Sequence, residues 1–98
     1  MNMQAMLKQA QKLQKDMLAT QEKINEMEFE GKSSIVTVKM NGKKEVKEIN
    51  IDAESLDKDE IEMLQDMLLV AMNDAMEKVN KETESKMGAY TQGMPGLF

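Results

Sequence analysis

The sequence contains no cysteine, no histidine and no arginine. Without cysteine, the chain can form neither a disulfide bond nor a thiolate metal site, which agrees with a reducing cytosol. Without histidine, it lacks the usual proton-transfer group near neutral pH and the commonest nitrogen ligand for metals. Without arginine, it lacks the planar donor that reads guanine or holds a carboxylate through two parallel hydrogen bonds.

These absences argue against an enzyme. No histidine is available to activate a serine or threonine, and the carboxylates fall in stretches expected to be exposed helix or hairpin. Asp57 and Asp59 resemble the opening of a calcium loop, but Glu62 stands where such a loop requires glycine. Acidic side chains also suit the first turn of a helix, so we predict no catalytic residues, no metal and no cofactor.

Long apolar runs are missing as well. The longest is residues 67–72, far too short to span a membrane. The lysines near the N-terminus are spread through an amphipathic pattern, which is not that of a secretory signal. An N-terminal helix lying on a membrane surface is disfavoured by its narrow apolar face and its lack of tryptophan and phenylalanine. We therefore expect a cytoplasmic protein with no membrane partner.

What the N-terminal segment does contain is a regular apolar pattern. Apolar or small residues recur at steps of three and four from Met3 to Met27, which predicts a long helix with a heptad seam. A helix of about 25 residues is roughly 38 Å long, so its far end is expected to project. The opposite face carries Lys8, Lys12, Lys15 and Lys23. Lysines opposite an apolar seam are often merely solvated, but segregated charge can also give an acidic protein (net charge −5) a positive arm.

A β-hairpin is predicted next. Residues 35–38 have the β-branched composition of a strand, and Asn41-Gly42 is the strongest short hairpin signal because both residues tolerate positive φ. If Val36, Val38 and Met40 face inward, the returning strand needs a bulge near Lys47-Glu48 or a longer turn. Two strands alone are only marginally stable, so the hairpin must pack on helices or join a partner's hairpin. Gly31 is interpreted as the end of the first helical region.

A second long helix is predicted to begin at Asp57, with Glu60 completing a capping box, and to end near Met87 because Gly88 suits a helix terminus. The apolar run 67–72 leaves no polar face for nearly two turns, so this helix must be covered on more than one side. A short chain cannot do this alone, and we predict a homodimer. The expected interface consists of Leu64, Met67, Leu68, Ala71, Met72 and Ala75, with the two small alanines allowing another helix to approach closely.

The predicted fold class is thus α+β, with a long N-terminal helix, an antiparallel β-hairpin and a long C-terminal helix. Residues 1–87 are expected to form one domain. Residues 88–98 contain three glycines and the only proline. They are expected to form an irregular tail that is either mobile or docked through Leu97 and Phe98.

Four segments together resemble the YbaB/EbfC family of bacterial nucleoid-associated proteins. They are MLKQAQKLQKDM, VTVKMNGKKEVKEINID, EMLQDMLLVAMNDAMEKV and the ending TQGMPGLF, with Asn73-Asp74-Ala75 and residues 94–98 the most characteristic. The resemblance covers essentially the whole chain. It implies a tweezer-like homodimer with a shared sheet, projecting helical arms, a location at the nucleoid and binding of duplex DNA with little sequence preference.

The expected DNA-binding residues are Lys8, Lys12, Lys15 and Lys23 of the first helix together with Lys78, Lys81 and Lys86 of the second. With no arginine and only three aromatic residues, little base readout or stacking is expected. The alternative function is a non-enzymatic scaffold that docks a protein partner through the methionine-rich helix or the C-terminal tail. The negative net charge and the Leu97-Phe98 terminus favour that alternative.

Overall fold

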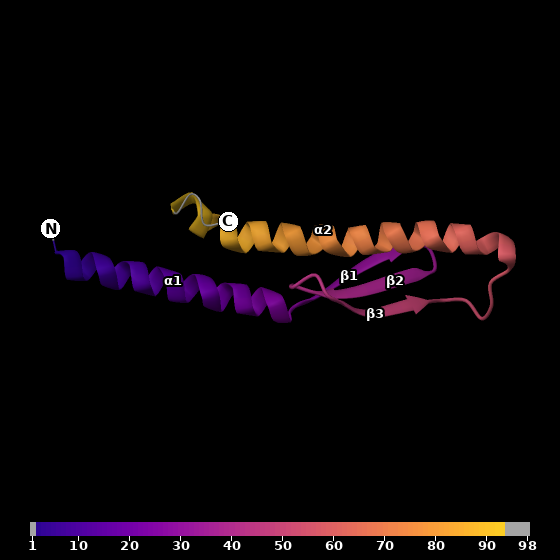
Figure 1. Ribbon diagram of the computed structural model, residues 1–98, viewed down its shortest axis with the longest axis horizontal. Coiled ribbons are helices and arrows are strands. Elements are labelled where there is room, and N and C mark those ends of the chain that lie inside the picture. The colour runs from indigo at the N-terminus through magenta and orange to yellow at the C-terminus, as the bar shows by residue number, and fades with distance from the viewer. Residues whose placement is uncertain (1, 94–98) are drawn as a thin grey trace.

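The structure, a computed structural model, describes residues 2–93. Its elements are α1 (Met3–Glu26), β1 (Glu28–Ser33), β2 (Val36–Asn41), β3 (Val46–Ile51), a short 3-10 turn η1 (Lys58–Glu60) and α2 (Ile61–Gly93). The predicted α+β class is confirmed, with one more strand than the sequence analysis expected. The chain is a rod of 71 × 20 × 13 Å, in which α2 lies along the sheet and α1 extends beyond it at the end where α2 finishes (Figure 1).

Helix α1 begins at a side-chain cap and ends by a turn into the sheet. The Asn2 carboxamide oxygen accepts hydrogen bonds from the backbone N–H groups of Gln4 (3.0 Å) and Ala5 (3.4 Å), which have no partner within the helix. Ile24, near the other end, is the one buried residue of α1. The N-terminal half is exposed, so the predicted projection of this helix is confirmed.

The sheet is antiparallel with the order β1-β2-β3. The predicted hairpin at Asn41-Gly42 is present, but the positive φ falls at Lys44 (64°). Asn41 holds the turn because its side-chain oxygen accepts from the N–H groups of Lys43 (2.9 Å) and Glu45 (3.0 Å). Gly42 is required for another reason: a Cβ there would overlap the Ile24 carbonyl group at the end of α1.

The predicted bulge is confirmed in strand β3. Lys39 pairs with Glu48 while the next residue, Met40, pairs with Val46, so Lys47 is the extra residue. The bulge lets Val46 and Ile49 share the face of the sheet that holds Met40 and Val38.

The core lies between α2 and the first two strands. Val36, Val38 and Met40 of β2 have no exposed surface, and they pack with Phe29 of β1 and Val79 of α2. Strand β3 lies farthest from α2 (Figure 1), and within residues 2–93 none of its Cα atoms lies within 8 Å of a Cα atom of that helix. Val46 and Ile49 are consequently 37% and 48% exposed, although their face of the sheet is the core face.

Two glycines behave differently from the sequence interpretation. Gly31 does not end a helical region, because α1 stops at Glu26 and Gly31 lies inside strand β1, where α2 crosses closely. Gly88 does not end α2, which continues to Gly93. The irregular tail predicted from residue 88 is therefore wrong for residues 88–93. The rest of that tail, with Leu97 and Phe98, lies outside the described residues.

The start of α2 agrees with the sequence prediction. Asp57 precedes the 3-10 turn, and its backbone N–H donates to the Glu60 carboxylate (3.4 Å) in the expected capping box. Ala71 and Ala75 do allow a close approach, but the element that approaches is strand β1 of the same chain. Both alanines have no exposed surface left for a second chain.

Candidate nucleic-acid interface

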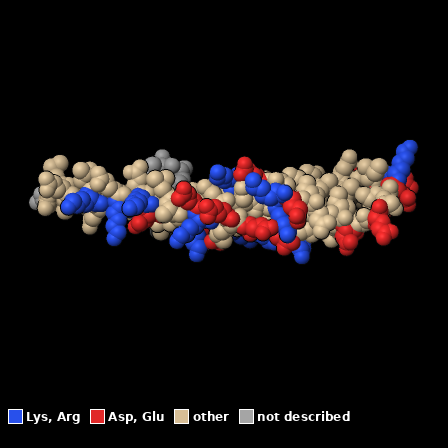
Figure 2. Space-filling model, turned by 90° about the horizontal axis from the view of Figure 1, so that it is seen from below, with Lys and Arg blue, Asp and Glu red and all other residues tan. Residues whose placement is uncertain are grey.

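The four lysines predicted on α1 are brought together on one exposed face. Lys8, Lys12, Lys15 and Lys23 all lie on the side of the helix away from buried Ile24. None of them forms an ion pair within residues 2–93. Figure 2, which views the molecule from the side away from α2, shows lysine atoms along the projecting arm with few acidic atoms between them.

The base of this arm is fixed to the rest of the chain. Ile24 is 1% exposed in the core, and the hydroxyl groups of Thr20 and Tyr90 lie 3.3 Å apart, which joins α1 to the far part of α2. Gly42 adds a backbone contact, because its N–H donates to the Asn25 carbonyl oxygen (3.3 Å). The lysines nearest the N-terminus therefore extend from a base that is packed on two sides.

The three lysines predicted on α2 are not equivalent to those of α1. The Lys78 ammonium group donates to the Glu30 carbonyl oxygen of β1 at 2.6 Å and lies 3.5 Å from the Asp74 carboxylate. Lys81 pairs with Glu77 at 3.6 Å along the exposed helix surface. Lys86 is exposed. Of the three, Lys78 is the one whose ammonium group bonds to the backbone of the same chain.

Asp74 is a site residue that the sequence analysis did not single out by its chemistry. Its carboxylate accepts a hydrogen bond from the Lys32 backbone N–H (3.1 Å). This bond, followed by the charges of Lys78 and Lys81, lowers the pKa of Asp74. In the sequence, Asp74 was noted only within Asn73-Asp74-Ala75, as part of the resemblance to the YbaB/EbfC family.

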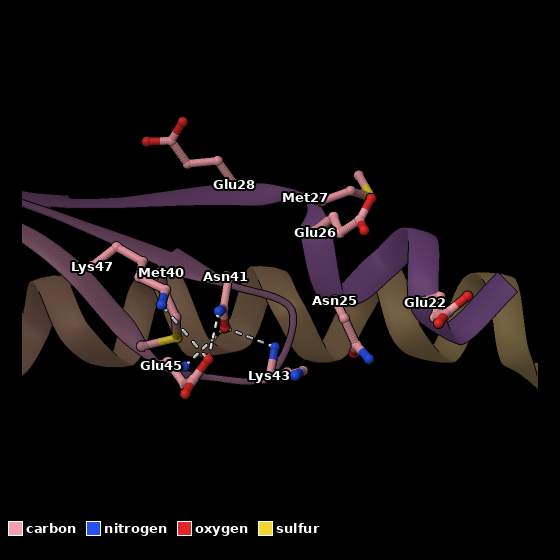
Figure 3. Close-up of a pocket in the computed structure, with 10 residues that line it drawn as sticks. All are labelled: Glu22, Asn25, Glu26, Met27, Glu28, Met40, Asn41, Lys43, Glu45 and Lys47. Carbon is pink, nitrogen blue, oxygen red and sulfur yellow. Dashed lines mark hydrogen bonds and ion pairs between the residues drawn. The ribbon is translucent and has the colours of Figure 1, made fainter. Parts of the chain in front are cut away.

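A hollow of about 650 Å³ lies where the end of α1 meets the β2–β3 turn (Figure 3). Its lining includes the carboxylates Glu22, Glu26, Glu28 and Glu45 and the ammonium groups of Lys43 and Lys47. The Asn41 side chain donates to Glu45 at 2.7 Å, and this bond and the charge of Lys47 lower the pKa of Glu45. Because carboxylates outnumber lysines, the hollow is a poor site for a phosphate and does not extend the cationic face of α1.

Acidic residues elsewhere do not converge. Within residues 2–93, no group of three or more aspartate, glutamate, histidine or cysteine side chains is arranged to hold a metal ion. No helix in the same described range has the length and apolar content needed to cross a membrane.

The residues predicted for a dimer interface fall into two groups. Leu64, Met67, Leu68 and Met72 are partly buried against the core and retain exposed surface, whereas Ala71 and Ala75 are covered by β1. Leu69 is 61% exposed on the same helix, and the core face of β3 is uncovered at Ile49. The single chain thus leaves apolar side chains exposed on both α2 and β3.

Comparison with known proteins agrees with the resemblance seen in the sequence. A model of the YbaB/EbfC DNA-binding family matches residues 1–94. A nucleoid-associated protein of Ligilactobacillus salivarius is 46% identical over 99% of this chain and 95% of its own length. One from Lactococcus lactis subsp. cremoris is 47% identical over 97% of this chain and 98% of its own. The chain belongs to the YbaB/EbfC DNA-binding family.

Proposed function

We propose that this protein binds duplex DNA with little sequence preference, and that a homodimer presents two α1 arms whose lysines contact backbone phosphates. The observation that carries the proposal is the exposed row of Lys8, Lys12, Lys15 and Lys23 on a projecting helix. Family membership and the nucleoid-associated relatives support DNA as the partner and the nucleoid, within the cytoplasm, as the location.

Phosphate contacts made by lysine carry no sequence information, because base identity is read in the grooves. The absence of arginine removes the commonest specific guanine contact. Eight α1 lysines in a dimer would release at most about seven counterions, which makes the affinity fall steeply with salt. Two chains of net charge −5 carry −10 together, and the resulting repulsion keeps the affinity modest at physiological salt.

Among the α2 lysines, we retain Lys81 and Lys86 as secondary DNA contacts. Lys78 is a weaker candidate because contact with a phosphate would compete with its bond to Glu30 and its pairing with Asp74. Its role in the proposed mechanism is to hold β1 against α2. A phosphate could recruit it only by breaking that attachment.

The proposed dimer buries the apolar surface that one chain leaves open. The core face of β3 and the exposed parts of Leu64, Met67, Leu68 and Met72 would be covered by the second copy. Ala71 and Ala75 are excluded from the interface because they have no surface to contribute. Dimerisation also doubles the number of arms, so that each duplex meets two cationic helices at once.

The test is a salt titration of duplex binding, with the mass of the protein in solution measured by light scattering in the same buffers. We expect a dimer that binds unrelated duplexes with similar affinity and loses affinity steeply between about 50 and 200 mM salt. A folded dimer that fails to retain duplex at 50 mM salt would contradict the DNA proposal. A single-chain mass at micromolar concentration would contradict the dimer.

A further inference from the structure

The two edges of the sheet are not alike. Strand β1 forms one edge and β3 the other, with β2 between them. An edge strand carries a row of backbone N–H and C=O groups that can pair with a strand of another molecule. What occupies these groups decides how many copies of the chain can join.

On the β1 edge, two backbone groups are already bonded to side chains of α2. The Lys32 N–H donates to the Asp74 carboxylate at 3.1 Å, and the Glu30 C=O accepts from the Lys78 ammonium group at 2.6 Å. Residues two apart in a strand direct their backbone groups to the same side, so these bonds occupy one edge. Asp74 and Lys78 are one helical turn apart and pair with each other at 3.5 Å, which holds both in place along the strand.

On the β3 edge, no side chain of α2 bonds to the backbone within residues 2–93, although the Ile51 C=O already accepts a hydrogen bond from the Ala53 N–H at 3.0 Å. The Asp52 N–H points toward β2, since it donates to the Ile35 carbonyl oxygen at 2.9 Å. Backbone direction alternates along an antiparallel strand, so the N–H groups of Ile51 and Ile49 point away from β2. Ile49 is also 48% exposed, and within the described residues no Cα atom of this strand lies within 8 Å of a Cα atom of α2.

We propose that Asp74 and Lys78 close the β1 edge, so that a second copy can pair only along β3 and assembly stops at two chains. This rests on the homodimer of the proposed function. With both edges open, β1 of one chain could pair with β3 of the next. Such head-to-tail contacts can be repeated from chain to chain without forming a closed assembly. With β1 closed, β3 pairs with its own symmetry mate, which uses both open edges and leaves none.

The matched comparison is between two acid–lysine pairs on the same helix. The D74A/K78A variant removes the closing pair, whereas E77A/K81A removes an ion pair with the same change in charge and no bond to β1. Light scattering over a range of concentrations should give a dimer for the wild type and for E77A/K81A. The D74A/K78A variant should form species larger than two chains that increase with concentration. A folded D74A/K78A variant that stays dimeric would overturn the proposal.

Amide hydrogen exchange tests the same idea in the wild-type protein, so it does not depend on a variant that folds. The Lys32 amide should be protected, and exchange at Ile49 and Ile51 should slow by at least about tenfold as dilute chains associate. Rapid exchange of the Lys32 amide would show that its hydrogen bond to Asp74 does not close the β1 edge. Rapid exchange at Ile49 and Ile51 in a confirmed dimer would show that the two chains do not pair along β3. It would not contradict the dimer itself.

A final pair of variants separates backbone pairing from apolar burial. Ile49→Pro removes an outward-pointing N–H, a position where an edge strand tolerates proline, while Ile49→Ala shortens the side chain and keeps the N–H. The proposal expects I49P to weaken dimerisation at least about tenfold more than I49A. Equal effects of the two substitutions would overturn the pairing along β3. A single-chain mass for the wild type is the separate result that overturns the dimer.

Discussion

Gly31 of β1 and Ala75 of α2 are in direct contact, and a Cβ added at Gly31 would lie 2.9 Å from the Cβ of Ala75. It would also overlap the carbonyl oxygen of Ala71. The helix and the strand therefore cross at a separation that only glycine permits. The bonds of Asp74 to Lys32 and of Lys78 to Glu30 lie on either side of this crossing and depend on it.

Gly31→Ala is expected to destabilise the protein by about 2 to 3 kcal/mol, because α2 must move away from β1 or the strand must distort. Urea unfolding followed by circular dichroism measures this loss. A stability equal to that of the wild type would show that the crossing adapts without cost.

Gly88→Ala is the matched control and should change stability in the opposite direction. Apart from its chain neighbours and the backbone of its own helix, a Cβ at Gly88 would meet no atom of the described residues within 4 Å, and Gly88 lies inside helix α2. Alanine in a helix interior is favoured over glycine by about 1 kcal/mol. The same urea experiment should therefore show a gain of roughly 0.5 to 1 kcal/mol.

Neutralising the arm should weaken DNA binding without dissociating the dimer. The K8Q/K12Q/K15Q variant removes six positive charges from two chains, so the slope of log affinity against log salt should decrease by up to about five. The K43Q/K44Q/K58Q variant loses the same charge at lysines outside the proposed DNA contacts and should change the slope less. An equal effect of both variants on fluorescence anisotropy would assign binding to net charge alone.

Acidification should weaken the attachment of Asp74 to β1. The pKa of this group is lowered in the folded chain, chiefly by the hydrogen bond from the Lys32 N–H. Its stabilising contribution is therefore present above the ordinary carboxyl pKa and is lost as pH falls through the lower folded value. We expect Asp74→Asn to reduce unfolding stability at pH 7 more than at pH 3. An equal reduction at the two pH values would show that ionisation of Asp74 contributes nothing.

The contact between Thr20 and Tyr90 should contribute to the orientation of the arm. Their hydroxyl groups are 3.3 Å apart and partly buried, so Tyr90→Phe is expected to cost about 1 kcal/mol. A double-mutant cycle with Thr20→Val isolates the pair, because the Thr20 hydroxyl also lies 2.9 Å from the Asp16 carbonyl oxygen. A coupling energy near zero would mean that apolar packing alone holds α1 to α2.

Local patterns in the sequence were sufficient for several elements. The three- and four-residue steps predicted α1, the Asn41-Gly42 pair predicted the turn, and the mismatch between the apolar residues of β2 and β3 predicted the bulge. These features depend on neighbours in the chain. The same is true of the capping box at Asp57 and Glu60.

The missed features depend on distant contacts. Strand β1, with the sequence EFEGKS, has no β-branched residue, and it is held by α2 and β2 instead of by its own propensity. Gly31 and Gly88 are alike in a sequence, yet one admits a crossing helix and the other lies within a continuous helix. Ala71 and Ala75 correctly indicated a close approach, but their spacing cannot distinguish a helix of a second chain from a strand of the first.

The elongated shape of the chain affects how its mass is measured. Its radius of gyration is 19.4 Å, whereas a compact domain of 100 residues has a value of about 13 Å. A rod tumbles and diffuses like a much heavier sphere, so a single chain would elute early from a gel-filtration column calibrated with globular standards. Hydrodynamic size alone would then mistake one chain for two, and stoichiometry has to be determined by a method that weighs the particle without assuming its shape.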